Sequence, residues 1–168
     1  VLATEYLDKT CPKNSDSRYF IDKMPLNFFN VGYILTSFPG AKIICLKRKP
    51  LDTCISNYRQ LFAINASYYH YTYCLDNTAH YYTLFHQLME HWKTLFPQNI
   101  LEVAYEELVL MPSIACKKIA AFCNLDWQEQ CLNFYNNTSP VATASAVQVR
   151  KPLYTHSIDS WKHYSSYT

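Results

Sequence analysis

Short apolar runs alternate with longer amphipathic stretches along this chain. Residues 41–46 read AKIICL, preceded by a Pro-Gly pair and followed by basic residues. Residues 100–104, ILEVA, form a second apolar run, and residues 19–21 form a third, shorter one. Runs of this length, rich in β-branched and apolar side chains and bounded by turn residues, predict β-strands.

Apolar residues recur at helical spacing between these runs, and Pro25 and Pro50 each suit the first turn of a helix. The predicted helix over residues 68–96 has a possible break near Asp76-Asn77. Residues 11–18 are expected to form a polar loop, and residues 136–155 an irregular segment. The expected helices cover residues 1–9, 26–37, 50–64, 68–96, 112–123 and 127–135. Strands that alternate with helices predict an α/β fold with a parallel sheet flanked by helices.

Three candidate ligand groups, Lys23, Arg48 and Tyr105, each follow a predicted strand. Ligands of parallel α/β sheets bind beyond the carboxyl ends of the strands. The pattern R-x-P-x-D-x-x-x-S begins at Arg48, whose guanidinium fork can converge with the Ser56 hydroxyl on one phosphate group. The alternative is a buried strand followed by an amphipathic helix with a surface arginine.

The composition of the chain argues against several classes of protein. With 168 residues, 49% hydrophobic and 16% aromatic, the chain can build a core and does not resemble a disordered segment. The net charge of +2 gives no argument for binding nucleic acid or an anionic membrane. No apolar run approaches a membrane span, and no signal-peptide pattern is present. With Gly32 and Gly40 as its only glycines, this sequence cannot form a G-x-x-x-x-G-K phosphate loop.

Cysteines and histidines do not suggest a metal centre. No CxxC pair occurs, and most cysteines fall at apolar positions, so we expect buried reduced thiols and a reducing, cytoplasmic location rather than disulfides or zinc. The four histidines of residues 68–96 match no metal-binding motif, and we expect no metal. The cysteines are Cys11, Cys45, Cys54, Cys74, Cys116, Cys123 and Cys131.

Four blocks, in order, carry a resemblance to a known family. They are FIDKMPLNFFNVGYI, FPGAKIICLKRKPLDTCISNY, ILEVAYEELV and TASAVQVRKPLY, followed by a late tryptophan. Together they resemble the bacterial-type sulfotransferases related to tyrosylprotein sulfotransferase, which use PAPS (3′-phosphoadenosine 5′-phosphosulfate). The resemblance implies a P-loop-like, three-layer α/β fold. Residues 1–168 would be the C-terminal part of one sulfotransferase domain, missing its first strand and phosphate loop.

The resemblance assigns a role to each matching residue. Lys23 would lie near the transferring sulfuryl group and Ser145 near the reaction centre. Arg48 and Ser56 would bind the 3′-phosphate, and Tyr105 would lie by the nucleotide. The family's C-terminal nucleotide loop falls on Gln148, Val149, Arg150 and Lys151. Without the resemblance, Lys23 would be a capping residue in a turn and Tyr105 an ordinary aromatic at a strand end.

Some positions depart from the family pattern. Ser160 stands where the family has a lysine beside the late tryptophan, and Gln60 stands where it has an arginine, with Arg59 one position away. The 5′-phosphosulfate loop and the catalytic base are expected before Val1. Glu106 and Glu107 suit the acidic first turn of a helix better than a catalytic role.

The expected activity is transfer of a sulfuryl group from PAPS to an acceptor hydroxyl, such as that of a protein tyrosine. The partners would be the nucleotide co-substrate and the acceptor, without nucleic acid, and a homodimer is an open possibility. Alternatives are a noncatalytic interaction or nucleotide-binding domain that retains the fold, and a kinase of the P-loop type. The Arg48–Ser56 pair separates these classes, because ATP has no 3′-phosphate.

Overall fold

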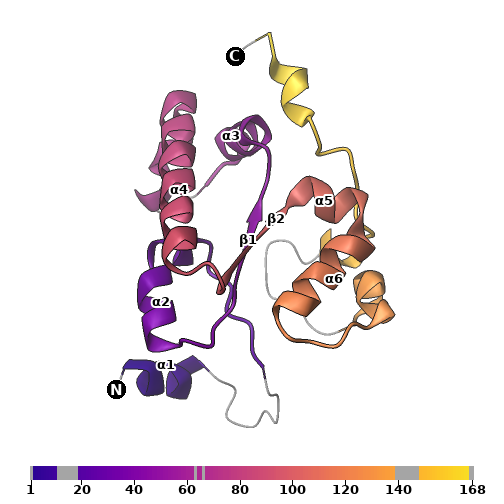
Figure 1. The fold of residues 1–168 in the computed structure, drawn as a ribbon. Helices are drawn as coiled ribbons and strands as arrows, with labels where there is room; N and C mark the ends of the chain where they lie inside the picture. The colour runs from indigo at the N-terminus through magenta and orange to yellow at the C-terminus, as the bar shows by residue number, and fades with distance from the viewer. Residues whose placement is uncertain (1, 11–18, 63, 66, 139–147, 167–168) are drawn as a thin grey trace. The chain divides into compact units, whose positions relative to one another are not determined.

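The computed structural model describes residues 2–10, 19–62, 64–65, 67–138 and 148–166 (Figure 1). Its strands are β1 (Ile43–Lys47) and β2 (Ile100–Ala104). Its α-helices are α1 (Leu2–Thr10), α2 (Val31–Ser37), α3 (Pro50–Arg59), α4 (Leu75–Leu95), α5 (Tyr105–Leu110) and α6 (Pro112–Phe122). Its 3₁₀ helices are η1 (Pro25–Phe29), η2 (Ser67–Tyr73), η3 (Glu129–Asn136), η4 (Gln148–Arg150) and η5 (Ser160–Tyr164).

The two strands are parallel neighbours in a two-stranded sheet. The chain between them contains α3, η2 and α4, which supply the long crossover that parallel strands require. The backbone N–H of Ile43 donates to the carbonyl oxygen of Asn99 (2.8 Å), next to the start of both strands. Two of the three predicted strands and the helix-rich α/β class are therefore confirmed.

The predicted strand over residues 19–21 is wrong, because these residues have no regular secondary structure. All three side chains are exposed, with Ile21 94% exposed. An apolar tripeptide becomes a strand only where a neighbouring strand pairs with it, and the sheet of the described chain consists of β1 and β2. Lys23 consequently follows an extended segment rather than a strand end.

The described chain divides into two compact units, and the first comprises residues 1–43 and 84–100. Its buried apolar side chains include those of Val31, Leu35 and Met89. The indole N–H of Trp92, on α4, donates to the carbonyl oxygen of Phe28 in η1 (2.9 Å). This bond fixes η1 and α2 beside the second half of α4.

The second unit comprises residues 44–83 and 101–168. Within it α5 packs on α6, and α3 contacts both η2 and η5. Its buried apolar side chains include Ile55, Val103 and Val109. The rings of Tyr71 and Tyr81 stack 3.8 Å apart. Burial, together with the neighbouring phenols, raises the pKa of Tyr71 to about 12. This unit contains the carboxyl ends of β1 and β2, after which two of the three candidate ligand groups, Arg48 and Tyr105, were predicted.

Several helix boundaries differ from those predicted. The helix over 26–37 is divided at Asn30 into η1 and α2, and α3 ends at Arg59 instead of continuing to residue 64. Residues Leu61 and Ile64, 90% and 80% exposed, contribute no buried face that would extend α3. The segment 127–135 forms the 3₁₀ helix η3 rather than an α-helix.

The break in the long helix falls at Cys74, close to the predicted position. The hydroxyl of Thr78, which is buried, lies within hydrogen-bonding distance of the carbonyl oxygens of Tyr71 (3.1 Å) and Cys74 (2.8 Å). It therefore satisfies carbonyl groups where η2 ends and α4 begins. Asp76 lies in the acidic first turn of α4.

The expected burial of the cysteines is only partly correct. Cys54 is buried, whereas Cys74 and Cys131 are exposed and Cys45, Cys116 and Cys123 are intermediate. The two exposed thiols lie at the break between η2 and α4 and in the 3₁₀ helix η3. All six described cysteines are free thiols, and Cys11 lies outside the described residues.

Gly32 permits the close approach of Trp92 to α2, and this makes a testable prediction. A Cβ atom at Gly32 would lie 3.0 Å from Cη2 of the Trp92 indole, whereas a Cβ at Gly40 would meet no atom within 4 Å. We expect Gly32→Ala to lower the free energy of unfolding by about 1–3 kcal/mol, because the indole must move. Gly40→Ala, the matched control, should be neutral or stabilising. Urea unfolding of both variants measures the difference, and equal stabilities would contradict it.

Candidate functional site

The basic turn, residues 47–49, joins β1 to α3. Pro50 is the first residue of the helix, as predicted, and Lys47 is the last residue of the strand, one residue beyond the predicted end. Lys49 has an extended backbone (φ −48°, ψ 139°), which suits a residue before proline. The strand therefore delivers three consecutive cations to the carboxyl end of the sheet, where parallel α/β folds bind ligands.

Both lysines of the basic turn form ion pairs within the chain. Lys47 Nζ lies 2.9 Å from Oε1 of Glu102 on β2, and both side chains are about four-fifths buried. Lys49 Nζ lies 2.6 Å from Oδ1 of Asp159, just before η5. The hydrogen bond to Asp159 raises the pKa of Lys49. Much of the positive charge of the turn is thus balanced by nearby carboxylates.

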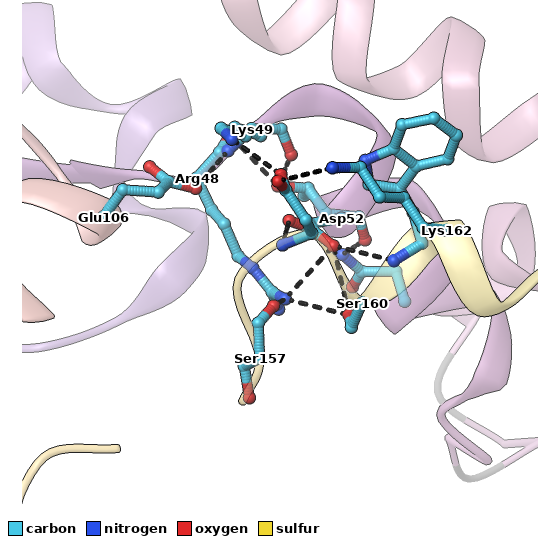
Figure 2. Close-up of polar contacts among 11 residues, drawn as sticks. Arg48, Lys49, Asp52, Glu106, Ser157, Ser160 and Lys162 are labelled. Atoms are coloured by element: carbon cyan, nitrogen blue, oxygen red, sulfur yellow. Dashed lines mark hydrogen bonds and ion pairs between the residues drawn. The ribbon is translucent and has the colours of Figure 1, made fainter. Parts of the chain in front are cut away.

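Asp52, in the first turn of α3, is completely buried. Its carboxylate accepts hydrogen bonds from the backbone N–H groups of Asp159 (2.8 Å) and Trp161 (3.0 Å), and from the hydroxyl of Ser160 (3.1 Å) (Figure 2). Arg48 Nη2 lies 3.5 Å from its Oδ1 atom. A buried carboxylate is costly unless it is both paired and hydrogen-bonded, and Asp52 meets both conditions. One side chain thereby ties residues 159–161 to α3.

Arg48 lies between this segment and the end of β2. Its Nη2 atom donates to the carbonyl oxygen of Ser157 and to the hydroxyl of Ser160 (3.2 Å) (Figure 2). The guanidinium carbon lies 5.3 Å from the centroid of the Tyr105 ring, within cation–π range. Arg48 and Tyr105, each predicted to follow a strand at one edge of the sheet, therefore lie together in the structure.

The Nε atom of Arg48 is buried and has no hydrogen-bond partner among the described residues. Buried N–H groups normally have partners, so an orphaned one calls for an explanation. A guanidinium has five N–H donors. The hydrogen bonds that the structure shows from Arg48 all leave from Nη2, so the Nε–H group retains the capacity to donate to an anion.

The backbone of the basic turn is held by groups from two other elements. Glu106, in the first turn of α5, accepts a hydrogen bond from the backbone N–H of Lys49 (3.0 Å). The hydroxyl of Tyr82, on α4, donates to the carbonyl oxygen of Arg48 (3.3 Å). The predicted place of Glu106 and Glu107 in an acidic first turn is confirmed. The bond from Lys49 gives Glu106 a further structural role.

Asp159 has a left-handed backbone conformation (φ 56°, ψ 22°), which aspartate tolerates better than most residues. Its backbone N–H donates to Asp52, while its carboxylate contacts Lys49 Nζ (2.6 Å) and Lys162 Nζ (2.9 Å). The hydrogen bonds from Lys49 and then Lys162 hold the pKa of Asp159 below its usual value.

Two further predicted site residues, Ser56 and Lys23, lie in other parts of the chain than the basic turn. Ser56 is exposed in the middle of α3, and the structure shows no hydrogen bond between it and Arg48. Lys23 is exposed just before η1 and belongs to the first unit, whereas Arg48, Ser56 and Tyr105 belong to the second. The predicted convergence of Arg48 and Ser56 on one phosphate is therefore not visible as a direct contact.

The predicted C-terminal nucleotide loop is described in part. Gln148, Val149 and Arg150 form the short helix η4, which contacts η3, and Lys151 follows it with an exposed side chain. Val149 and Arg150 are half-buried. Ser145 lies outside the described residues.

Sequence reasoning assigned no role to Asp52, Ser157 or Asp159. Asp52 was visible inside the R-x-P-x-D-x-x-x-S pattern, but an acidic residue in a first helical turn is common and carries little signal by itself. Ser160 was noted only as a departure from a family lysine. The structure gives it bonds to both Asp52 and Arg48.

The described part of the chain shows neither a metal-binding cluster nor a membrane-spanning helix. It contains no group of three or more His, Cys, Asp or Glu side chains placed to hold a metal ion. None of its helices combines the length and apolar character needed to cross a bilayer.

Comparison with known proteins identifies the family. Residues 1–129 match the model of the Sulfotransferase family, and these residues include β1, the basic turn, β2 and Tyr105. The chain belongs to the sulfotransferase family. A relation to tyrosylprotein sulfotransferase in particular remains a hypothesis, and segment 157–162 lies beyond the matched residues.

One similar protein is an uncharacterized protein of Aquifex aeolicus (strain VF5). It is 39% identical to this chain over 165 residues, which cover 98% of this chain and 22% of that protein. The sulfotransferase chain thus spans about a fifth of the length of this relative. The alignment covers Asp52 and most of segment 157–162, because it includes nearly the whole chain.

The lowered pKa of Asp159 predicts how stability depends on pH. A carboxylate whose pKa is depressed by folding stabilises the folded state above its unfolded pKa, near 3.8, and loses this contribution as the pH falls through the lower folded value. Asp159→Asn keeps a side chain that tolerates the left-handed backbone but removes the charge. We expect the variant to be less stable than the wild type at pH 6 and the difference to shrink below pH 4.

Urea unfolding at a series of pH values measures this difference. Asp126→Asn serves as a control for loss of one acidic group, because Asp126 is exposed in the loop before η3. A difference between wild type and Asp159→Asn that stays constant down to pH 2 would show that the ion pairs of Asp159 do not stabilise the fold.

Proposed function

We propose that this chain is the nucleotide-handling part of a PAPS-dependent sulfotransferase that transfers a sulfuryl group to an acceptor hydroxyl, such as that of a protein tyrosine. One observation carries the proposal: in a member of the sulfotransferase family, Arg48 and Tyr105 come together from the carboxyl ends of two parallel strands. A phosphate binds well to a guanidinium fork held in one orientation.

Arg48 is suited to bind the 3′-phosphate of the nucleotide. It retains an Nε–H donor without a partner among the described residues, and the Tyr105 ring supports one face of its guanidinium. Ser56, from the second half of the R-x-P-x-D-x-x-x-S pattern, would add a hydroxyl donor. The segment from Gln148 to Lys151 would add donors over the nucleotide, as the family resemblance implies.

The transfer itself forms a bond between the acceptor oxygen and sulfur and breaks the bond between sulfur and the bridging phosphate oxygen. The acceptor proton passes to a base, and 3′,5′-phosphoadenosine (PAP) leaves. Negative charge develops on the bridging oxygen as its bond to sulfur breaks. We propose that the Lys23 ammonium stabilises this charge, with Ser145 as a hydrogen-bonding neighbour.

The ion pairs of the basic turn favour a second candidate function. Lys47 and Lys49 already have carboxylate partners, as expected of a noncatalytic domain that retains the fold without binding an anion. Measurement of nucleotide binding distinguishes the two candidates directly.

The 3′-phosphate assignment predicts a preference between two nucleotides that differ only in this group. In the full-length polypeptide that contains this sequence, PAP should bind about 10- to 100-fold more tightly than AMP, because charge-assisted hydrogen bonds contribute about 1.5–3 kcal/mol each. Arg48→Ala should remove most of the preference, and Arg48→Lys should keep part of it, since lysine keeps the charge but not the fork.

Titration calorimetry with PAP and AMP measures both affinities, and circular dichroism first establishes that each variant is folded. Arg48→Ala should also raise the KM for PAPS more than it lowers kcat, because Arg48 would bind the ground state and the transition state alike. Equal affinities of the wild type for PAP and AMP would refute the assignment and favour the noncatalytic domain.

A catalytic role for Lys23 predicts a different kinetic signature. Lys23→Ala and Lys23→Met should lower kcat by roughly 10²-fold or more with little change in the KM for PAPS, because the charge that they would stabilise develops only in the transition state. Lys42→Ala is the matched control, since Lys42 is also an exposed lysine of the first unit, with its Nζ atom 2.9 Å from the carbonyl oxygen of Gln98. A folded Lys23→Ala enzyme with normal kcat would make Lys23 a turn residue only.

A further inference from the structure

The burial of Asp52 is unusual for a residue so close to a candidate anion site. Its side chain is 0% exposed, yet it lies in the first turn of the helix that follows the basic turn. A negative charge beside Arg48 would weaken the attraction of Arg48 for a phosphate if it had no other partner. The effect of Asp52 on Arg48 therefore depends on the other hydrogen-bond partners of the Asp52 carboxylate.

The three hydrogen-bond donors to Asp52 all come from residues 159–161. Two are backbone N–H groups and one is the Ser160 hydroxyl, so they can be brought together only if this short segment takes one conformation. The left-handed backbone of Asp159 belongs to that conformation. These donors stabilise the buried carboxylate, so Asp52 does not depend on Arg48 alone for its partners.

The same segment also holds Arg48. Nη2 of Arg48 donates to the carbonyl oxygen of Ser157 and to the Ser160 hydroxyl, and Oγ of Ser160 contacts both Arg48 and Asp52 (Figure 2). The Tyr105 ring lies against the guanidinium. A long arginine side chain is thus fixed on one edge by residues 157–160 and on one face by an aromatic ring.

We infer that Asp52 is a positioning residue for anion selectivity: it fixes residues 157–161 against α3, and these residues set the orientation of the Arg48 guanidinium. The inference rests on the proposed function, because the anion is the 3′-phosphate of the nucleotide. A guanidinium that is already ordered loses less rotamer freedom when it binds, so its affinity for the phosphate is higher.

Asp52→Ala should therefore weaken the binding of PAP by roughly 2- to 12-fold, the effect of immobilising one long side chain at binding rather than before it. The affinity for AMP should not change, because AMP lacks the group that Arg48 binds. Asp52→Asn keeps one carbonyl oxygen as an acceptor and should lose less than Asp52→Ala. Asp76→Ala is the matched control, an exposed aspartate in the first turn of α4.

Titration calorimetry of the full-length polypeptide with PAP and with AMP measures the ratio of the two affinities. If the wild type shows no preference for PAP, the proposed function fails. If the wild type prefers PAP and Asp52→Ala keeps the same ratio, the proposed function stands and the positioning role is refuted. A loss of affinity for both nucleotides alike would mean a merely structural role and would also refute it.

Tighter binding of PAP by Asp52→Ala would overturn the inference in the opposite direction, because it would show that residues 157–160 compete with the phosphate for Arg48. If Asp52→Ala does not fold, Ser160→Ala decides the question. That variant removes one bond to Asp52 and one from Arg48 but leaves the backbone donors of Asp159 and Trp161 in place. It should lower the PAP/AMP affinity ratio, and an unchanged ratio would refute the positioning role.

Discussion

The candidate site depends on one interaction. The buried carboxylate of Asp52 accepts hydrogen bonds from the backbone of a segment far along the chain. Asp52 precedes its partners by more than a hundred residues, and the hydrogen bonds between them join two parts of the chain that are far apart in sequence. Removing one partner from a buried charge costs far more than the pair contributes in net stability. The arrangement therefore behaves as a unit, in which the β1–α3 turn and residues 157–161 are ordered together.

The fold and the Asp52 interactions make different contributions to the candidate site. Two parallel strands bring Arg48 and Tyr105 to one edge, which is a property of the topology. The orientation of the guanidinium, in contrast, comes from carbonyl and hydroxyl groups of residues 157–160. These residues lie beyond the part of the chain that matches the family model. The topology thus brings Arg48 to this edge, and its surroundings come from Tyr105 and from residues 157–160.

The sequence predicted features that have a local cause. The runs at 41–46 and 100–104 form strands because apolar and β-branched residues are bounded there by turn residues, although Ile44 and Leu46 of β1 are exposed. Pro50 and Pro112 begin helices because their fixed φ suits a first turn. The run at 19–21 carries a similar signal but forms no strand, because pairing depends on a neighbour that local composition cannot supply. The ends of helices were predicted least well. Leu61 and Ile64 are apolar and suggested a longer helix, yet both are exposed and lie beyond the end of α3.

For the candidate site residues, too, features with a local cause were predictable and contacts between distant parts of the chain were not. Strand-end reasoning placed Arg48 and Tyr105 directly after β1 and β2, where the structure has them, but it misplaced Lys23, because residues 19–21 form no strand. It could not find the Asp52 contacts, which join an ordinary first-turn aspartate to a left-handed residue far along the chain. Ser56 matched a pattern by spacing alone, and a spacing does not specify which way a side chain on a helix points.

The internal pairing of Lys47 and Lys49 has a consequence for how an anion would arrive. Each lysine and its carboxylate together present a dipole, whose field decays faster with distance than that of a single charge, and salt screens what remains beyond about 8 Å at physiological ionic strength. Long-range steering, which accelerates the encounter of oppositely charged molecules, is then weak. Selectivity for an anion at such a site would come from the dissociation rate rather than the association rate. An anion would reach the turn about as often as a neutral molecule of its size, and only an anion that fits would stay bound.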